Sequence, residues 1–80
     1  MEKINLQQFS NKIEAEKACK KNNTTIKEVV LDNISDIIAA LHNIADKIEN
    51  NEKTVNEDWV EAAVPLNTIM NAVSNDWYIN

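Results

Sequence analysis

Two side chains in this sequence are of types that could work as a catalytic or metal-binding pair. His42 is the only histidine, so it would have to be the base of any Ser–His–Asp set. It lies four residues before Asp46, and this spacing on a helix is typical of an ordinary surface or boundary pair. A metal site would have to add Asp32 and Asp36, which spreads the ligands over about four helical turns, too far for one ion. We expect no enzyme activity, no metal and no cofactor.

The first third of the chain concentrates lysines around a single cysteine. Cationic neighbours can lower the pKa of a thiol such as Cys19 and make it reactive. The favoured alternative is a small apolar residue at the edge of a helix. The same lysines suggest phosphate binding, with Trp77 or Tyr78 stacking on a base, although the absence of Gly excludes a phosphate-cradling loop. These lysines are Lys12, Lys17, Lys20, Lys21 and Lys27.

Acidic side chains gather around residues 46–61. Only Lys47 and Lys53 oppose them there. If the helices on either side are antiparallel, the acids converge at one end of a hairpin and can attract a basic surface. Plain solvation of an exposed turn, together with favourable placement at a helix N-terminus, explains them equally simply. The acidic turn consists of Asp46, Glu49, Glu52, Glu57, Asp58 and Glu61.

No residue from Ala62 to Asn75 is ionised. Interface centres are depleted in charge and use uncharged polar groups for hydrogen bonds, so this stretch predicts an oligomer or partner interface. An ordinary Asn-rich surface is the alternative. The terminal aromatics either anchor a partner or pack beside Phe9. The predicted interface consists of Asn67, Met70, Asn71, Ser74, Asn75, Trp77 and Tyr78.

Helix boundaries follow from the turn residues. Without Gly, Asn is the residue best suited to positive φ at helix ends, and Asn pairs occur at 22–23 and 50–51. A capping box follows each pair, Thr25 with Glu28 and Thr54 with Glu57. These signals predict helices over about 5–21, 25–50 and 55–77.

The middle helix has the clearest apolar pattern. Its residues recur at spacings of four and three, as in a coiled-coil seam, and further apolar residues widen this stripe until it suits more than one neighbour. The seam is Val30, Ile34, Ile37, Leu41, Ile44 and Ile48, and the widening residues are Leu31, Ile38 and Ala45. In the last helix, Pro65 predicts a kink rather than a break, because Val64 is a poor N-cap. The first helix has a short apolar face of Leu6, Phe9 and Ile13, and its second half is expected to face solvent.

The predicted fold is all-α, a single domain spanning residues 1–80. A long antiparallel hairpin of the last two helices, kinked at Pro65, has the short first helix packed across it. An 80-residue chain has a marginal core, and a lone cysteine allows no internal disulfide. We therefore expect a homodimer or higher homo-oligomer, in which two hairpins would form a four-helix bundle.

Net charge and composition limit the classes of function that we expect for this chain. The net charge is −5, and the complete absence of Arg argues against sequence-specific nucleic-acid binding. No apolar segment is long enough to span a membrane, and Met1–Phe9 lacks the apolar core of a signal peptide. The expectation is a cytoplasmic protein-binding module, an inhibitor or antitoxin-like factor of bacterial or phage origin that occupies a basic surface. A small cyclic-nucleotide sponge and a structural adaptor are the alternatives.

Overall fold

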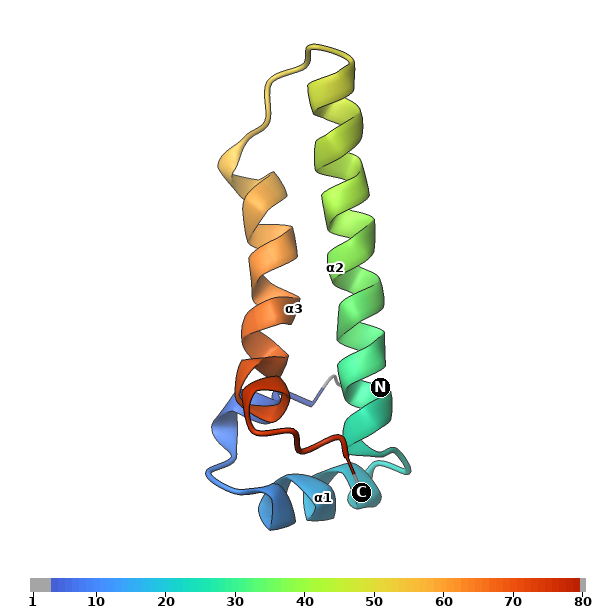
Figure 1. The fold of residues 1–80 in the computed structure, drawn as a ribbon, viewed down its shortest axis with the longest axis vertical. Coiled ribbons are helices and arrows are strands. Elements are labelled where there is room, and N and C mark those ends of the chain that lie inside the picture. Colours follow the sequence, from blue (N-terminus) through green and yellow to red (C-terminus); the bar gives the residue numbers. More distant parts are fainter. Residues whose placement is uncertain (1–3, 80) are drawn as a thin grey trace.

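The computed structural model describes residues 4–79, which form a helical hairpin closed at one end by a short crossing helix. In chain order these are a 3₁₀ turn, η1 (Leu6–Gln8), and three α-helices, α1 (Lys12–Lys21), α2 (Ile26–Glu49) and α3 (Asn56–Ser74). Figure 1 shows α2 and α3 antiparallel and side by side, with α1 lying across their open end. The described residues contain no strand. The predicted all-α hairpin with a short N-terminal helix packed across it is confirmed.

Each α-helix ends in the same way, at an Asn or Asp residue in the left-handed region. Asn23, Asn51 and Asp76 have φ of 56°, 57° and 55°. After α2, the Glu52 N–H donates to the Lys47 carbonyl at 2.8 Å and the Asn51 N–H to the Ile48 carbonyl at 3.2 Å, which is a Schellman motif. The two predicted Asn pairs are therefore confirmed as helix ends.

The start of α2 agrees with its predicted cap, whereas the start of α3 does not. Thr25 Oγ1 accepts the Glu28 N–H at 3.1 Å. The N-cap of α3 is Val55 rather than Thr54, and the Asp58 carboxylate accepts the Val55 N–H at 2.9 Å. The predicted box of Thr54 and Glu57 is thus wrong by one residue. Asp58 rather than Glu57 forms this cap because its carboxylate also pairs with Lys47 across the hairpin. The spacing of residues in the sequence does not reveal that contact.

The first helix is shorter than predicted, because the chain turns before it. Residues 6–8 form only η1, and Asn11 then caps α1 by accepting the Glu14 N–H at 3.0 Å. This break lets η1 pack against α3 while α1 crosses the open end of the hairpin. One continuous helix over 5–21 could not make both contacts.

The last helix continues through Pro65 as expected but ends sooner than predicted. Its C-cap is Asn75, so Trp77 and Tyr78 lie beyond the helix. The side chain of Asn75 donates to the Asn71 carbonyl at 2.8 Å. The pair Asn75-Asp76 repeats the Asn-pair signal of the two earlier helix ends, and it would have located this end from the sequence.

The hydrophobic core lies at the α1 end of the hairpin. Its fully buried side chains include Leu6 from η1, Cys19 from α1 and Ile69 from α3. In α1 the buried residues are Ala15 and Cys19, whereas Ile13 is 67% exposed. The predicted apolar face of the first helix is therefore wrong at Ile13. The interruption of the helix at residues 9–11 changes the rotational phase of α1, so Ala15 and Cys19 rather than Ile13 are buried.

Candidate functional site

Only half of the apolar stripe of α2 is covered by α3. Val30 and Ile44 are 5% and 3% exposed, and Ile37 is partly buried. Ile34, Leu41 and Ile48, predicted to belong to the same seam, are 37%, 48% and 59% exposed. The seam therefore straddles the edge of the α2–α3 contact. The residues that widen it lie still further round α2 and are exposed.

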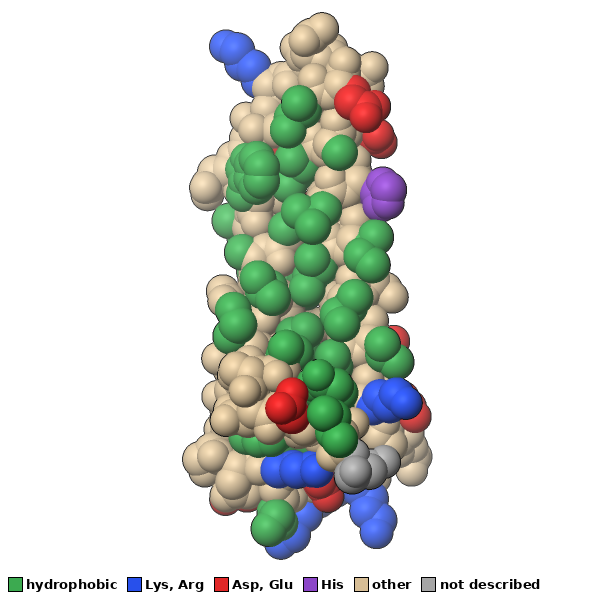
Figure 2. All heavy atoms as spheres, viewed as in Figure 1, with side chains coloured by type: hydrophobic (Ala, Val, Ile, Leu, Met, Phe, Trp, Pro, Cys, Tyr) green, Lys and Arg blue, Asp and Glu red, His purple; other side chains and the backbone are tan. Residues whose placement is uncertain are grey.

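A matching row of exposed apolar side chains follows α3. Helical periodicity of about 100° per residue places the exposed rows of α2 and α3 on the same side of an antiparallel pair. Figure 2 shows hydrophobic side chains running along both helices over most of the length of the hairpin. We call this surface the apolar face; it comprises Leu31, Ile34, Ile38, Leu41, Ala45 and Ile48 of α2 and Trp59, Ala63, Leu66, Met70 and Val73 of α3, all exposed.

The apolar face is large for a chain of this size. From Leu31 to Ile48, α2 rises about 26 Å, and two helices side by side are about 20 Å wide, so the face covers on the order of 500 Å². The largest apolar patch on a monomer commonly covers about 300–600 Å² and is often functional. None of its residues is ionisable. A surface without ionisable side chains is poorly suited to catalysis and well suited to packing against another apolar surface.

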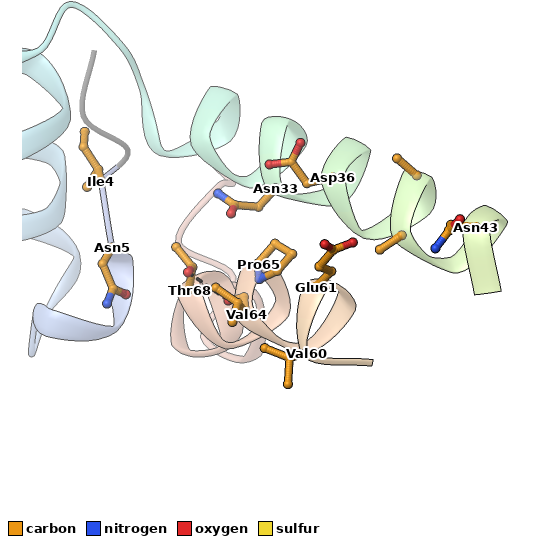
Figure 3. Close-up of a pocket in the computed structure, with 12 residues that line it drawn as sticks. Ile4, Asn5, Asn33, Asp36, Asn43, Val60, Glu61, Val64, Pro65 and Thr68 are labelled. Carbon is orange, nitrogen blue, oxygen red and sulfur yellow. Dashed lines mark hydrogen bonds between the residues drawn. The ribbon is translucent and has the colours of Figure 1, made fainter. Parts of the chain in front are cut away.

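The opposite side of the hairpin has a different character. A pocket of about 650 Å³ lies there, between α2 and α3, and Ile4 and Asn5 also line it. Figure 3 shows the polar side chains Asn33, Asp36 and Asn43 of α2 lining it, with Glu61 and Pro65 of α3. Asn33 is buried and donates to the Val29 carbonyl at 2.8 Å. The two sides of the hairpin therefore differ in charge: the apolar face is uncharged, whereas the pocket side carries Asp36 and Glu61 among apolar residues such as Val60 and Val64.

The acidic turn is gathered at the closed end of the hairpin, but not all of its members face solvent. Asp58 is 7% exposed and receives two hydrogen bonds from Lys47 Nζ, both at 2.8 Å. These hydrogen bonds, with a further one from the Val55 N–H, hold the pKa of Asp58 below its ordinary value. Asp58 thus clamps α2 to α3. The exposed carboxylates are those of Asp46, Glu49, Glu52, Glu57 and Glu61, and Glu61 also lines the pocket between α2 and α3.

The predicted interface residues of α3 divide into three groups. Asn71 belongs to the fold, because its side-chain amide donates to the Leu6 and Phe9 carbonyls at 3.0 and 3.1 Å and holds η1 in place. Asn75 caps α3. Met70 lies within the apolar face, while the exposed residues Asn67 and Ser74 border it. Sequence reasoning missed the structural role of Asn71, because its partners are more than sixty residues away.

The terminal aromatics pack against the core rather than projecting from it. Trp77 and Tyr78 are partly buried and contact the core cluster, and together with Lys20 and Lys27 they line a pocket of about 290 Å³. Lys12 lies elsewhere and donates to the Ile79 carbonyl at 2.8 Å. Lys17 and Lys21 line a separate shallow pocket with Lys20. The five lysines therefore do not form one site.

The indole of Trp59 and the thiol of Cys19 lie in opposite environments, one exposed and one buried. Trp59 is 49% exposed, and its indole N–H donates to Thr54 Oγ1 at 3.2 Å. Cys19 is buried, and burial raises the pKa of its thiol, with further increases from Glu16 and Glu28. The favoured interpretation of Cys19 as a small apolar residue rather than a reactive thiol agrees with this, although Cys19 lies in the core and not at its edge, since a high pKa makes a thiol a poor nucleophile.

The described residues include neither a metal-binding cluster nor a membrane-spanning helix. Within residues 4–79 no group of three or more His, Cys, Asp or Glu side chains is arranged to hold a metal ion. No helix in the same range has the length and apolar character needed to cross a membrane. No protein-family model, curated protein or solved structure matches the chain.

Proposed function

We propose that this chain is a non-catalytic protein-binding module whose principal binding surface is the apolar face. The observation that carries the proposal is the uninterrupted row of exposed, uncharged side chains along both helices of the hairpin. Keeping such a surface in water is unfavourable, and covering it with another protein recovers that free energy at about 25 cal/mol per Å². Trp59 and Met70 are of the residue types that enrich interface centres.

The acidic turn gives such a module a preference among partners. Five exposed carboxylates at the closed end of the hairpin attract a basic surface over a longer range than apolar contacts do. This supports a small acidic inhibitor or antitoxin-like protein that occupies a basic site. Reversing Glu49, Glu52 and Glu57 to Lys is expected to slow association with such a partner and to reverse the salt dependence of its rate, because added salt would then screen a repulsion.

The test of the proposed function compares two variants with matched charge changes. Ile38 lies in the apolar face at 52% exposure, and Val64 lies on the opposite side at 57% exposure. Partners retained by the immobilised wild-type chain from cell extract should be retained equally by Val64→Glu and lost with Ile38→Glu. A partner bound equally by both variants would refute the apolar face as the binding surface. Circular dichroism of each variant controls for folding.

The pocket beside Trp77 supports a second candidate, a small-nucleotide sponge. Lys20 and Lys27 supply positive charge and the aromatic rings supply stacking surfaces. Glu16 lines the same pocket and opposes an anion there. Calorimetry with cyclic di- and trinucleotides tests this candidate. Heat that disappears in Lys27→Glu would support it, and no heat with any of them would rule it out.

A bacterial or phage origin and a cytoplasmic location complete the proposal. The thirteen Asn residues, with many Lys and Ile, are typical of AT-rich coding sequence. A lone cysteine suits a reducing compartment. A structural adaptor would use the same surface, and it differs from an inhibitor only in holding two different partners at once.

A further inference from the structure

The apolar stripe of α2 is broader than the surface that α3 and α1 cover, so one side of the stripe stays exposed. α3 packs along one side of the stripe, and α1 meets α2 only at the open end of the hairpin. On the uncovered side, the exposed residues of α2 from Leu31 to Ile48 recur at spacings of three and four. Those of α3 from Trp59 to Val73 do the same. Such spacing is that of helices packed side by side in a left-handed bundle.

We propose that the apolar face is covered by a second copy of this chain, packed antiparallel, so that two hairpins form a four-helix bundle. This inference rests on the proposed function and names the partner of the same face. A hairpin with heptad-like rows on both helices is half of such a bundle, and a second hairpin of the same length and spacing completes it. Because α2 and α3 are themselves antiparallel, each helix in this bundle has antiparallel neighbours.

The size of the molecule suits such a pair. The chain measures 46 × 24 × 20 Å, so its broad side covers about 1,100 Å². A stable interface buries about 800 Å² on each partner. The apolar face would form the centre of this interface, and polar side chains at its edges, including Asn67 and Ser74, would form the rim.

Charge decides between the two symmetric ways of packing face to face. In a symmetric pair the two acidic turns lie either at the same end of the bundle or at opposite ends. Residues 46–61 carry six acids and two lysines, a net charge of −4, whereas α1 carries four lysines and two glutamates, a net charge of +2. Placing the turns together brings two negative ends into contact. Placing them at opposite ends sets each acidic turn beside the α1 of the other copy.

The first experiment is the solution mass of the full chain by light scattering behind size exclusion. The expected mass is twice 9.1 kDa, with Ile38→Glu and Leu66→Glu reduced to monomers and Val64→Glu remaining a dimer. A wild-type monomer at high micromolar concentration would overturn the inference, and so would a dimer that survives both face variants. A monomer leaves the proposed function standing, because the face would then be free for a different protein. Loss of partner capture by both Ile38→Glu and Val64→Glu would instead count against the proposed function alone.

The second experiment measures the orientation. A spin label on Glu52→Cys, in a Cys19→Ala background, marks the exposed turn. Antiparallel packing places the two labels at a distance comparable with the 46 Å length of the chain. Packing with both turns at one end would bring them within about two helix diameters, 20 Å, and this result would overturn the antiparallel arrangement.

Discussion

Asn51 occupies the left-handed position after a helix that glycine most often fills. Its φ of 57° is in the left-handed region, which Gly occupies without steric cost and other residues occupy at a cost of about 1 kcal/mol or more, less for Asn. We expect Asn51→Gly to raise the free energy of unfolding by up to about 1 kcal/mol. Urea unfolding at fixed protein concentration measures this.

The neighbouring residue supplies the control. Asn50 has φ of −90°, and its side chain donates to the Asp46 carbonyl at 2.9 Å. Asn50→Gly should therefore lower the stability that Asn51→Gly raises. Equal effects of the two substitutions would show that the backbone conformation at Asn51 is not limiting.

Asp58 makes stability depend on pH in the acid range. Hydrogen bonds from Lys47 and from the Val55 N–H lower its pKa in the folded state below the ordinary value of an aspartic acid, 3.8. A lowered folded pKa means that the carboxylate stabilises the fold above the unfolded pKa, and that this contribution is lost as pH falls through the folded pKa. The Tm of the wild type should exceed that of Asp58→Asn at pH 7, and the difference should shrink below pH 3.8.

The exposed neighbour Glu57 is the matched control for this prediction. Glu57→Gln removes a carboxylate one residue away that has no such clamp role, so its Tm should follow the wild type closely over the same pH range. A difference between wild type and Asp58→Asn that stays constant from pH 7 to pH 3 would contradict the assignment.

At the scale of elements, the attachment of η1 depends on one side chain of α3. Asn71 binds the Leu6 and Phe9 carbonyls, and its backbone N–H donates to the side chain of Gln7. Asn71→Ala leaves both carbonyls without this donor, so we expect a loss of about 1–3 kcal/mol in the free energy of unfolding. Thermal or urea unfolding measures it.

Asn67, one turn earlier on the same helix, is exposed and is the natural comparison. Asn67→Ala should change the stability by no more than about 0.5 kcal/mol. A loss as large as that of Asn71→Ala would mean that the asparagines of α3 act through helix propensity rather than through the contact with η1.

At the scale of the whole molecule, the stabilising contacts are unevenly distributed. The core cluster lies at the α1 end, while the other half of the hairpin relies on a few buried residues such as Ala40 and Ile44 and on the Lys47–Asp58 pair. A region with few buried apolar contacts opens with a lower free energy than the core does. Covering the apolar face would supply the contacts that this half lacks.

This uneven distribution of buried contacts predicts different rates of hydrogen exchange along the chain. If a second copy covers the apolar face as proposed, amides of residues 40–48 and 59–66 should exchange slowly in the wild type. In Ile38→Glu these amides should exchange at least about tenfold faster, which corresponds to about 1.4 kcal/mol, while those around Cys19 and Ile69 change little. Uniform acceleration along the chain would indicate global destabilisation instead.

The amino-acid sequence by itself determined the helical class and most helix ends. Thr25 and the turns at the Asn pairs use hydrogen bonds to backbone groups three to five residues away, and such local interactions can be recognised from spacing alone. The third pair, Asn75-Asp76, carried the same signal. The apolar stripe of α2 was equally visible, because residues three and four apart share a face of a helix.

Only the tertiary structure decided which part of that stripe is covered and which side chains serve the fold. Periodicity groups residues on a face but does not give the rotation of a helix against its neighbour, so Ile44 became buried and Ile48 exposed. Asp58 and Asn71 took structural roles because Lys47 and the carbonyl of Leu6 are brought beside them by folding. Contacts between residues far apart in the sequence produce no recognisable spacing pattern. These contacts determine which surface stays exposed for a partner.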